Sequence, residues 1–325
     1  MNKFKLIFVQ VIFFLEYYIM ILETKLSNLD NKPIKVNKKS PPRSINPDLT
    51  PFYFTAMFIG AKNSGKSYGL VKLLKFYENE PIKDADNNTL QIRTILFCPT
   101  ANSAANPIFQ SLKTLGEDDI ILNYSDDALL DKIEEISIEK QEIEEYNKYI
   151  KAWKKFEKLE DIEKLDDEEV LLLSKRGFND PDMLPKPRYK FPPVIFIILD
   201  DLIGNNECFK RGNCTISNIT IKHRHLGINI IYTSQNPKSI PNIIRNNVDI
   251  FCLYKFANTK MVLEKLYDEV SSFLTEDEFE SVYKHATAEP HNCLYIDTHP
   301  NTHKDKRLRR NFDIVLSIVG HQTTN

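Results

Sequence analysis

The chain has 325 residues, which is enough for one large globular domain or two ordinary ones. Its 43 basic and 45 acidic side chains give a formal charge of −2, which excludes a protein that holds nucleic acid through bulk charge alone. With only 9 glycines and 17 prolines, the sequence is not that of a collagen-like or long flexible chain. Five scattered cysteines without a C-x-x-C pair favour reduced thiols, as in the cytosol, over a disulfide framework.

The N-terminus is apolar over residues 1–24. Within it, residues 4–22 are about long enough to cross a bilayer, and no small-residue cleavage site of a secretory signal follows them. Three interpretations remain open: a membrane anchor, a buried or amphipathic helix, and an over-extended start with Met20 as the initiator. Residues 25–50 carry lysines and prolines without a periodic pattern, which predicts a polar linker.

From residue 51 onward, apolar runs alternate with helical patterns. Residues 68–77 have helical spacing, and strand-like runs occur at 52–59, 92–98, 194–199, 228–232, 250–254 and 293–296. Strands that alternate with helices indicate an α/β domain with a mainly parallel sheet covered on both faces. We therefore expect one domain over residues 51–325.

Residues 126–190 interrupt this alternation. Apolar residues recur there at helical spacing among many glutamates and lysines, and a proline-rich stretch ends the segment. The pattern predicts a charged helical hairpin inserted in the α/β domain. A partner-binding coiled coil is the alternative, but the apolar stripe is too short to establish a heptad repeat.

A complete phosphate-loop motif, G-x-x-x-x-G-K-[ST], lies between the first strand and the first helix. Its residues are Gly60, Ala61, Lys62, Asn63, Ser64, Gly65, Lys66 and Ser67. Glycines let the backbone turn so that its N–H groups face a phosphate, and the helix N-terminus adds positive potential. We expect Lys66 to reach the β- and γ-phosphates of ATP and the Ser67 hydroxyl to bind Mg²⁺.

A second motif follows the apolar run at 194–199, where Asp200 and Asp201 stand side by side. A buried parallel strand delivers such carboxylates to the edge of the sheet where the phosphate loop also lies. We expect Asp200 to hold Mg²⁺, through water, and Asp201 to orient the attacking water. A strand ending in a solvated turn is the alternative.

Two further candidates come from the next strand and the segment after it. Gln235 follows the run at 228–232 and could hydrogen-bond the γ-phosphate or the attacking water. Arg245 lies ten residues later, and a guanidinium can neutralise charge on a transferring phosphoryl group, often across a subunit boundary. A structural salt bridge is the alternative for Arg245, and Arg224 is a second candidate for the arginine.

Together these motifs resemble the viral genome-packaging ATPases of the poxvirus type in the FtsK–HerA superfamily. The resemblance covers about residues 51–300 and rests on the ordered set, listed here: the phosphate loop, Asp200-Asp201, His223-Arg224-His225-Leu226-Gly227, Thr233-Ser234-Gln235, and Pro241 followed by Arg245-Asn246-Asn247. It implies a RecA-like P-loop NTPase core, ring-shaped homo-oligomers, and ATP-driven movement of double-stranded DNA into a capsid. It also implies capsid or portal-region partners, in the host cytoplasm or the virion.

Other readings stay open at this point. The phosphate loop and acidic pair also fit a helicase or AAA+ ring, and the apolar N-terminus with the helical insertion fits a membrane-tethered, nucleotide-dependent switch or scaffold. A basic cluster at residues 304–310 could contact DNA phosphates or simply form a solvated charged face.

Overall fold

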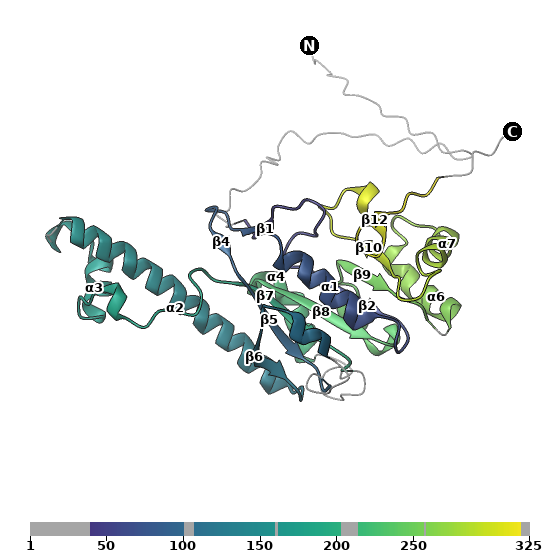
Figure 1. The fold of residues 1–325 in the computed structure, drawn as a ribbon, viewed down its shortest axis with the longest axis horizontal. Coiled ribbons are helices and arrows are strands. Elements are labelled where there is room, and N and C mark those ends of the chain that lie inside the picture. The colour runs from purple at the N-terminus through teal and green to yellow at the C-terminus, as the bar shows by residue number, and fades with distance from the viewer. Residues whose placement is uncertain (1–39, 101–106, 160–161, 203–213, 257, 320–325) are drawn as a thin grey trace, which may run out of the picture. The chain divides into compact units, whose positions relative to one another are not determined.

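The computed structural model describes residues 40–100, 107–159, 162–202, 214–256 and 258–319 (Figure 1). The described residues belong to one compact unit that begins at Ser40. The apolar segment at residues 1–24 and most of the expected linker lie outside the described residues. Among the helices that are described, none combines the length and hydrophobicity needed to cross a bilayer.

A central nine-stranded sheet organises the described residues (Figure 1). In spatial order its strands are β12 (Ile314–Val315), β11 (Leu308–Arg310), β10 (Leu294–Asp297), β9 (Ile250–Leu253), β2 (Thr55–Ile59), β8 (Ile228–Ser234), β7 (Val194–Leu199), β5 (Ile92–Phe97) and β6 (Leu115–Ile121). Strands β9 to β6 in this order pair in parallel, which confirms the predicted α/β fold with a mainly parallel central sheet.

One edge of the sheet is antiparallel. Strands β10, β11 and β12 pair antiparallel with their neighbours, and β10 also pairs antiparallel with β9. The connection from β11 to β12 is only residues 311–313, and so short a link can join antiparallel strands but not parallel ones.

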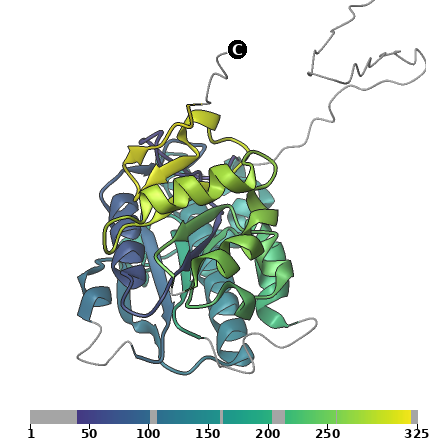
Figure 2. The ribbon, with the colours of Figure 1, turned by 90° about the vertical axis from the view of Figure 1, so that its right-hand side faces the viewer.

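Helices cover both faces of the sheet (Figure 2). Helix α1 (Lys66–Glu78) and the short helix η1 (Pro107–Ser111) pack on one face. The other face is covered by the start of α2 and by four further helices: α4 (Thr215–Leu226), α5 (Asn242–Arg245), α6 (Thr259–Val270) and α7 (Glu276–Ala286). Within β2, Met57 belongs to one apolar core and Phe58 to the other, as the period of two in a strand requires.

Residues 40–50, which the sequence assigned to the linker, pack on this unit. A small sheet of β1 (Arg43–Ser44), β3 (Ile82–Lys83) and β4 (Thr89–Leu90) includes part of them. The buried Thr50 hydroxyl donates a hydrogen bond to Asp297 Oδ2 at 2.6 Å and lies 2.7 Å from the Tyr295 hydroxyl. Residues of β1 and Thr50 are therefore part of the packed unit, ahead of the predicted domain start at residue 51.

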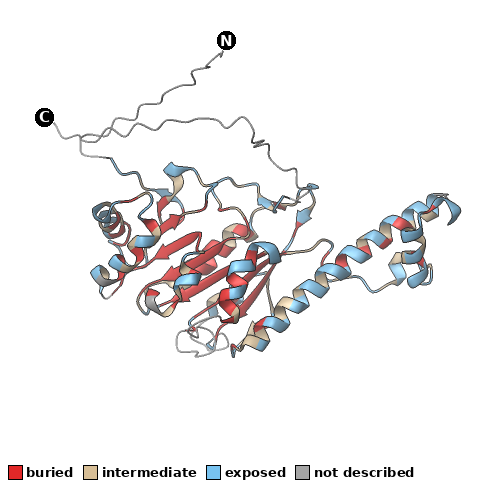
Figure 3. Ribbon diagram, turned by 180° about the vertical axis from the view of Figure 1, so that it is seen from behind, coloured by how far each residue is buried: buried red, intermediate tan, exposed pale blue. Residues whose placement is uncertain are grey.

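The charged insertion forms an arm that extends from the sheet (Figure 1). It consists of the long helix α2 (Asp126–Leu159), the short helices η2 (Ile162–Lys164) and η3 (Pro181–Met183), and α3 (Asp167–Lys175). Figure 3 shows that most of its surface is exposed, while a small separate core joins α2 to α3. That core is built on Tyr149, Ala152, Leu165 and Leu173. Two more short helices, η4 (Pro237–Ser239) and η5 (Lys304–Lys306), lie in loops.

Candidate nucleotide-binding site

The phosphate loop joins the carboxyl end of β2 to the start of α1. Two backbone hydrogen bonds fix its first residues to neighbouring strands: Gly60 N donates to Ser234 O (3.2 Å), and Ala61 N donates to Lys255 O (3.0 Å). The loop is therefore attached to the ends of both strands that flank β2, β8 on one side and β9 on the other.

Two glycines of the loop are required by its geometry. Gly65 has φ 101°, in the left-handed region that disfavours residues with a Cβ. Gly60 has a different reason, since a Cβ there would lie 2.5 Å from Tyr254 Cβ and 2.7 Å from Ser64 Oγ. The backbone of the loop at Gly60 thus packs directly against Tyr254.

The start of α1 can accept an anion. Its cap residue Gly65 supplies no side-chain hydrogen bond, and the first turn contains no acidic residue. Such a terminus presents unpaired N–H groups and a positive dipole end, which together suit a phosphate. Within the described residues, the buried Ser64 hydroxyl also lacks a hydrogen-bond partner. These groups fit a nucleotide phosphate chain.

Lys66 lies across its own loop. Its Nζ donates to Gly60 O and Ala61 O, each at 2.9 Å. Burial lowers the pKa of Lys66, while the charges of Asp201 and Asp200 act in the opposite direction. The charges of both carboxylates after β7 thus act on the ammonium group of Lys66. The phosphate loop and the acidic pair therefore belong to one site.

Asp200 is buried and held from two sides. Thr233 Oγ1 donates to Asp200 Oδ1 at 2.7 Å, and Cys98 Sγ donates to Asp200 Oδ2 at 3.3 Å. Burial raises the pKa of Asp200, and the hydrogen bonds from Thr233 and Cys98 act against this rise. A buried carboxylate of this kind gains from a nearby cation, because a cation offsets the cost of desolvating its charge.

Asp201 turns the opposite way. Its φ is 51°, a left-handed conformation that is uncommon for a residue with a side chain, and its side chain is exposed. Gln235 Nε2 donates to Asp201 Oδ1 at 3.2 Å, so these two predicted site residues are in contact. The structure therefore brings Lys66, Asp200, Asp201 and Gln235 to one edge of the sheet.

The oxygen atoms at this edge suit Mg²⁺. Small hard divalent cations prefer hydroxyl and carboxylate oxygens together with water and nucleotide phosphates. The Ser67 hydroxyl and the Asp200 carboxylate are ligands of this class, and the raised pKa of Asp200 reflects a carboxyl group whose charge the protein alone leaves poorly stabilised. These two residues would hold the ion.

Both candidate arginines are bonded to residues outside this group. Arg245 Nε donates to Glu269 Oε1 at 2.9 Å, and its other nitrogens donate to Pro237 O, Ile240 O and Asn242 Oδ1. Arg224 Nη2 donates to Asp249 Oδ1 at 2.8 Å. Within this chain Arg245 thus has the geometry of the structural salt bridge that the sequence left as the alternative.

Sequence reasoning gave no role to three neighbours of the site. Thr233 and Cys98 hold Asp200, and although Thr233 belongs to the motif set, nothing in the sequence indicates this contact. His291 flanks the phosphate loop: a Cβ on Gly65 would lie 3.4 Å from His291 Nδ1. All three come from elements far from the phosphate loop in sequence, and only the sheet order brings them near it.

The basic cluster at residues 304–310 is partly structural. Arg309 is buried and donates to Lys306 O, Asp48 O and Phe312 O, while Lys306 pairs with Asp48. The guanidinium of Arg307 lies over the Phe273 ring. Lys306 and Arg309 thus hold the C-terminal strands to the residues around Asp48, which leaves fewer charges for a polyanion than the sequence suggested.

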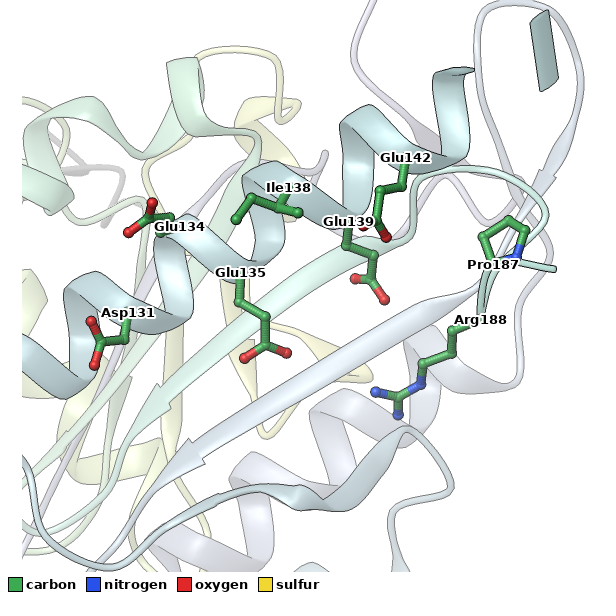
Figure 4. A pocket seen from close by; sticks show the side chains of 8 residues that line it. All are labelled: Asp131, Glu134, Glu135, Ile138, Glu139, Glu142, Pro187 and Arg188. Carbon is green, nitrogen blue, oxygen red and sulfur yellow. The ribbon is translucent and has the colours of Figure 1, made fainter. Parts of the chain in front are cut away.

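A separate cavity of about 490 Å³ lies at the base of the arm (Figure 4). Its wall on α2 is acidic, and Glu135 and Glu139 point toward the sheet, where both bind the buried Arg93 of β5. Arg93 also forms an ion pair with the buried Asp119 of β6, and Arg188 lies 3.5 Å from the same carboxylate. These ion pairs fasten the arm to the sheet.

No protein-family model matches the chain, and no curated protein matches its sequence. Among solved structures, the chain is similar to the genome packaging NTPase B204 from Sulfolobus turreted icosahedral virus 2 in complex with AMP. The identity is 15%, covering 82% of this chain and 98% of that chain, with a TM-score of 0.41. A viral genome-packaging NTPase, the kind of protein that the motif set resembles, is therefore among its structural neighbours.

Two bacterial secretion proteins are also similar to it. EssC (ATPases 2 and 3) from Geobacillus thermodenitrificans has 18% identity, covering 76% of this chain and 38% of that chain, with a TM-score of 0.40. The cytoplasmic domain of the Thermomonospora curvata type VII secretion ATPase EccC has 12% identity, covering 80% of this chain and 24% of that chain, with a TM-score of 0.38. The chain spans well under half the length of these two proteins.

Proposed function

We propose that the chain is a Mg²⁺-dependent ATPase that moves double-stranded DNA, and that it packages a viral genome into a capsid as part of a ring of identical subunits. One observation supports the enzymatic part of the proposal: a complete phosphate loop, two carboxylates and an amide lie at one edge of the sheet. The charges of both carboxylates act on Lys66, and the amide of Gln235 contacts Asp201. The DNA-packaging part rests on the motif set and its resemblance to genome-packaging ATPases.

In this proposal the loop binds the phosphate chain. The N–H groups at the start of α1 bind the non-transferred phosphates, and Lys66 moves from its own loop carbonyls to the β- and γ-phosphates. Ser67 and Asp200 hold Mg²⁺, which when bound neutralises charge that develops on the transferring phosphoryl group.

Asp201 and Gln235 would act on the attacking water. Their side chains are in contact and exposed, so a water molecule can reach both. The Asp201 carboxylate accepts a proton of that water, and the Gln235 amide holds the oxygen in line with the γ-phosphorus. We assign the base to Asp201 rather than Asp200, because the Asp201 side chain is exposed to water whereas Asp200 is buried.

Stimulation of ATP turnover by DNA is the deciding experiment. The full chain is assayed for phosphate release with Mg²⁺ and ATP, alone and with double-stranded DNA over a range of salt concentrations. A packaging motor requires the DNA-dependent increase, which should weaken as salt rises. Turnover without any response to DNA would favour the nucleotide-dependent scaffold, and preference for single strands or forks would favour a helicase.

A further inference from the structure

Thr233 occupies the point where the candidate catalytic strands meet. It lies near the end of β8, which runs between the phosphate-loop strand β2 and the acidic-pair strand β7. Its backbone is in register with Phe58 of β2, one residue before the end of that strand. The side chain is 3% exposed, so its hydroxyl must find partners within the protein.

The hydroxyl makes two hydrogen bonds, one to each residue of the acidic pair. It donates to Asp200 Oδ1 at 2.7 Å and accepts from the backbone N–H of Asp201 at 2.9 Å. A hydroxyl has a single proton, and an N–H group can only donate. The directions of both bonds are therefore fixed, and the hydroxyl cannot rotate toward another acceptor without losing Asp200.

The two bonds act on opposite features of the pair. The first holds the carboxylate of Asp200, which burial otherwise disfavours. The second holds the peptide that precedes Asp201, where φ is 51° and the chain turns sharply. A strained left-handed residue persists only when its surroundings hold it. One side chain thus bonds both the inward-pointing Asp200 and the peptide at which Asp201 turns toward Gln235.

We propose that Thr233 is a positioning residue that sets the relative orientation of the two carboxylates, so that Asp200 is preorganised for Mg²⁺ and Asp201 for the attacking water. The proposal rests on the proposed ATPase function and adds to it a residue whose hydroxyl bonds only the acidic pair among the described residues. Its hydroxyl acts through Asp200 and Asp201, as the outer partners of metal ligands do elsewhere.

The test compares Thr233→Val, which keeps shape and removes the hydroxyl, with Thr233→Ser, which keeps the hydroxyl. Thr94→Val is the matched control, because Thr94 is also buried in a strand of the sheet, β5. Its hydroxyl lies 2.8 Å from that of Thr114 and is not bonded to the acidic pair. Binding of a non-hydrolysable ATP analogue is titrated by calorimetry with increasing Mg²⁺ and also in EDTA, and ATP turnover is measured separately.

We expect Thr233→Val to raise the Mg²⁺ concentration for half-maximal analogue binding and to lower kcat, each by about 10–100-fold. Analogue binding in EDTA should be unchanged, and kcat should fall more than the KM for ATP rises. Thr233→Ser should stay within about threefold of wild type, and Thr94→Val should leave the Mg²⁺ response unchanged.

An unchanged Mg²⁺ response in Thr233→Val would overturn this role for Thr233. The proposed ATPase function would stand if the wild-type chain binds the analogue in a Mg²⁺-dependent way. If the wild-type chain itself shows no Mg²⁺-dependent analogue binding, the proposed function fails instead. If Thr233→Val does not fold, Thr233→Ala replaces it. Failure of both to fold, with Thr233→Ser folded, would assign the hydroxyl to fold stability and overturn the proposal.

Discussion

The hydroxyl of Tyr254 occupies the space that a Cβ on Gly69 would need, only 1.7 Å from its ideal position. Tyr254 follows β9, and its backbone N donates to Ile59 O at 2.7 Å, directly before the phosphate loop. Its Cβ abuts Gly60 and its ring reaches under α1 to Gly69. This one buried tyrosine thus supports the phosphate loop at both ends, and two glycines make room for it.

The contact predicts that Gly69→Ala destabilises the protein. Alanine normally stabilises a helix interior by about 1 kcal/mol over glycine. Here the added methyl group must displace a buried phenol, and such overpacking costs about 1–3 kcal/mol. Denaturant unfolding measures the difference. The matched background is Tyr254→Phe, in which Gly69→Ala should cost less; an equal cost in both backgrounds would contradict this explanation.

The phosphate loop predicts a strong dependence on Lys66. Lys66→Ala removes the ammonium that would offset charge on the β- and γ-phosphates, and we expect turnover to fall by about 10²-fold or more. Lys62→Ala is the control, because Lys62 is an exposed lysine of the same loop. That variant should stay within about threefold of wild type, since only backbone groups of Lys62 would face the nucleotide. Equal rates for the two variants in a phosphate-release assay would contradict the assignment of Lys66 to the phosphates of ATP.

The sequence predicts the site best where its residues are contiguous. The phosphate loop, its strand and its helix form one stretch of chain, and the two aspartates directly follow a fully buried strand. Because the carboxyl ends of parallel strands share one edge, the meeting of these motifs follows from the fold class alone. The predicted strands at 92–98, 194–199, 228–232 and 250–254 accordingly appear as β5, β7, β8 and β9, with shifts of at most two residues at their ends.

The sequence fails where a contact joins distant segments. Strand β6 was missed because it carries two consecutive aspartates, and the buried Asp119 is paired with distant cations, chiefly Arg93, 26 residues earlier. Thr50 was assigned to the linker because its partner Asp297 lies 247 residues away. Thr233 is similar in this respect: the sequence places it in the motif set, but its bond to Asp200, 33 residues earlier, follows only from the fold.

The burial of Asp200 should lower the stability of the metal-free protein, although the same carboxylate is proposed to bind Mg²⁺. Burial raises its pKa in the folded protein above the ordinary value of about 3.9, so folding favours the neutral form. Its contribution to stability is therefore fully present below about pH 3.9 and is lost as the pH rises through the raised pKa. Asparagine cannot ionise, and at pH 7 in EDTA we expect Asp200→Asn to raise Tm by the order of a few degrees.

The same comparison should disappear or reverse under two conditions. As the pH falls toward the ordinary carboxyl pKa of about 3.9 the gain should shrink, because more of the wild-type Asp200 is then neutral. With Mg²⁺ and a non-hydrolysable ATP analogue the wild-type protein should become the more stable one, because ligand that binds only the folded state adds stability. Asp201→Asn is the control, since that side chain is exposed and its Tm in EDTA should change little. A lower Tm for Asp200→Asn at pH 7 in EDTA would contradict the reasoning.

Replacing Arg245 should show whether this residue has a structural or a catalytic role. Its ion pair with Glu269 is largely buried, with side chains 15% and 9% exposed, and its remaining donors bind two loop carbonyls and Asn242. Removing one partner of a buried pair leaves the other charge unpaired. Arg245→Ala should therefore cost about 3–5 kcal/mol in unfolding free energy. Arg224→Ala is the control, because that guanidinium is exposed and Asp249 keeps its hydrogen bond from Thr55 N, so the loss should be about 0–1 kcal/mol.

If Arg245 instead acts on ATP held by a neighbouring subunit, different results follow. Arg245→Ala would keep its stability and its ATP binding and would lose about 10³-fold in turnover. Mixing it with Lys66→Ala subunits would then restore some hydrolysis, because the first chain keeps an intact phosphate loop and the second still offers its arginine. The bonds that Arg245 makes within its own chain favour the structural outcome, in which stability falls and mixing restores nothing. A stable Arg245→Ala protein that is rescued by mixing would show that the guanidinium leaves Glu269 when subunits assemble.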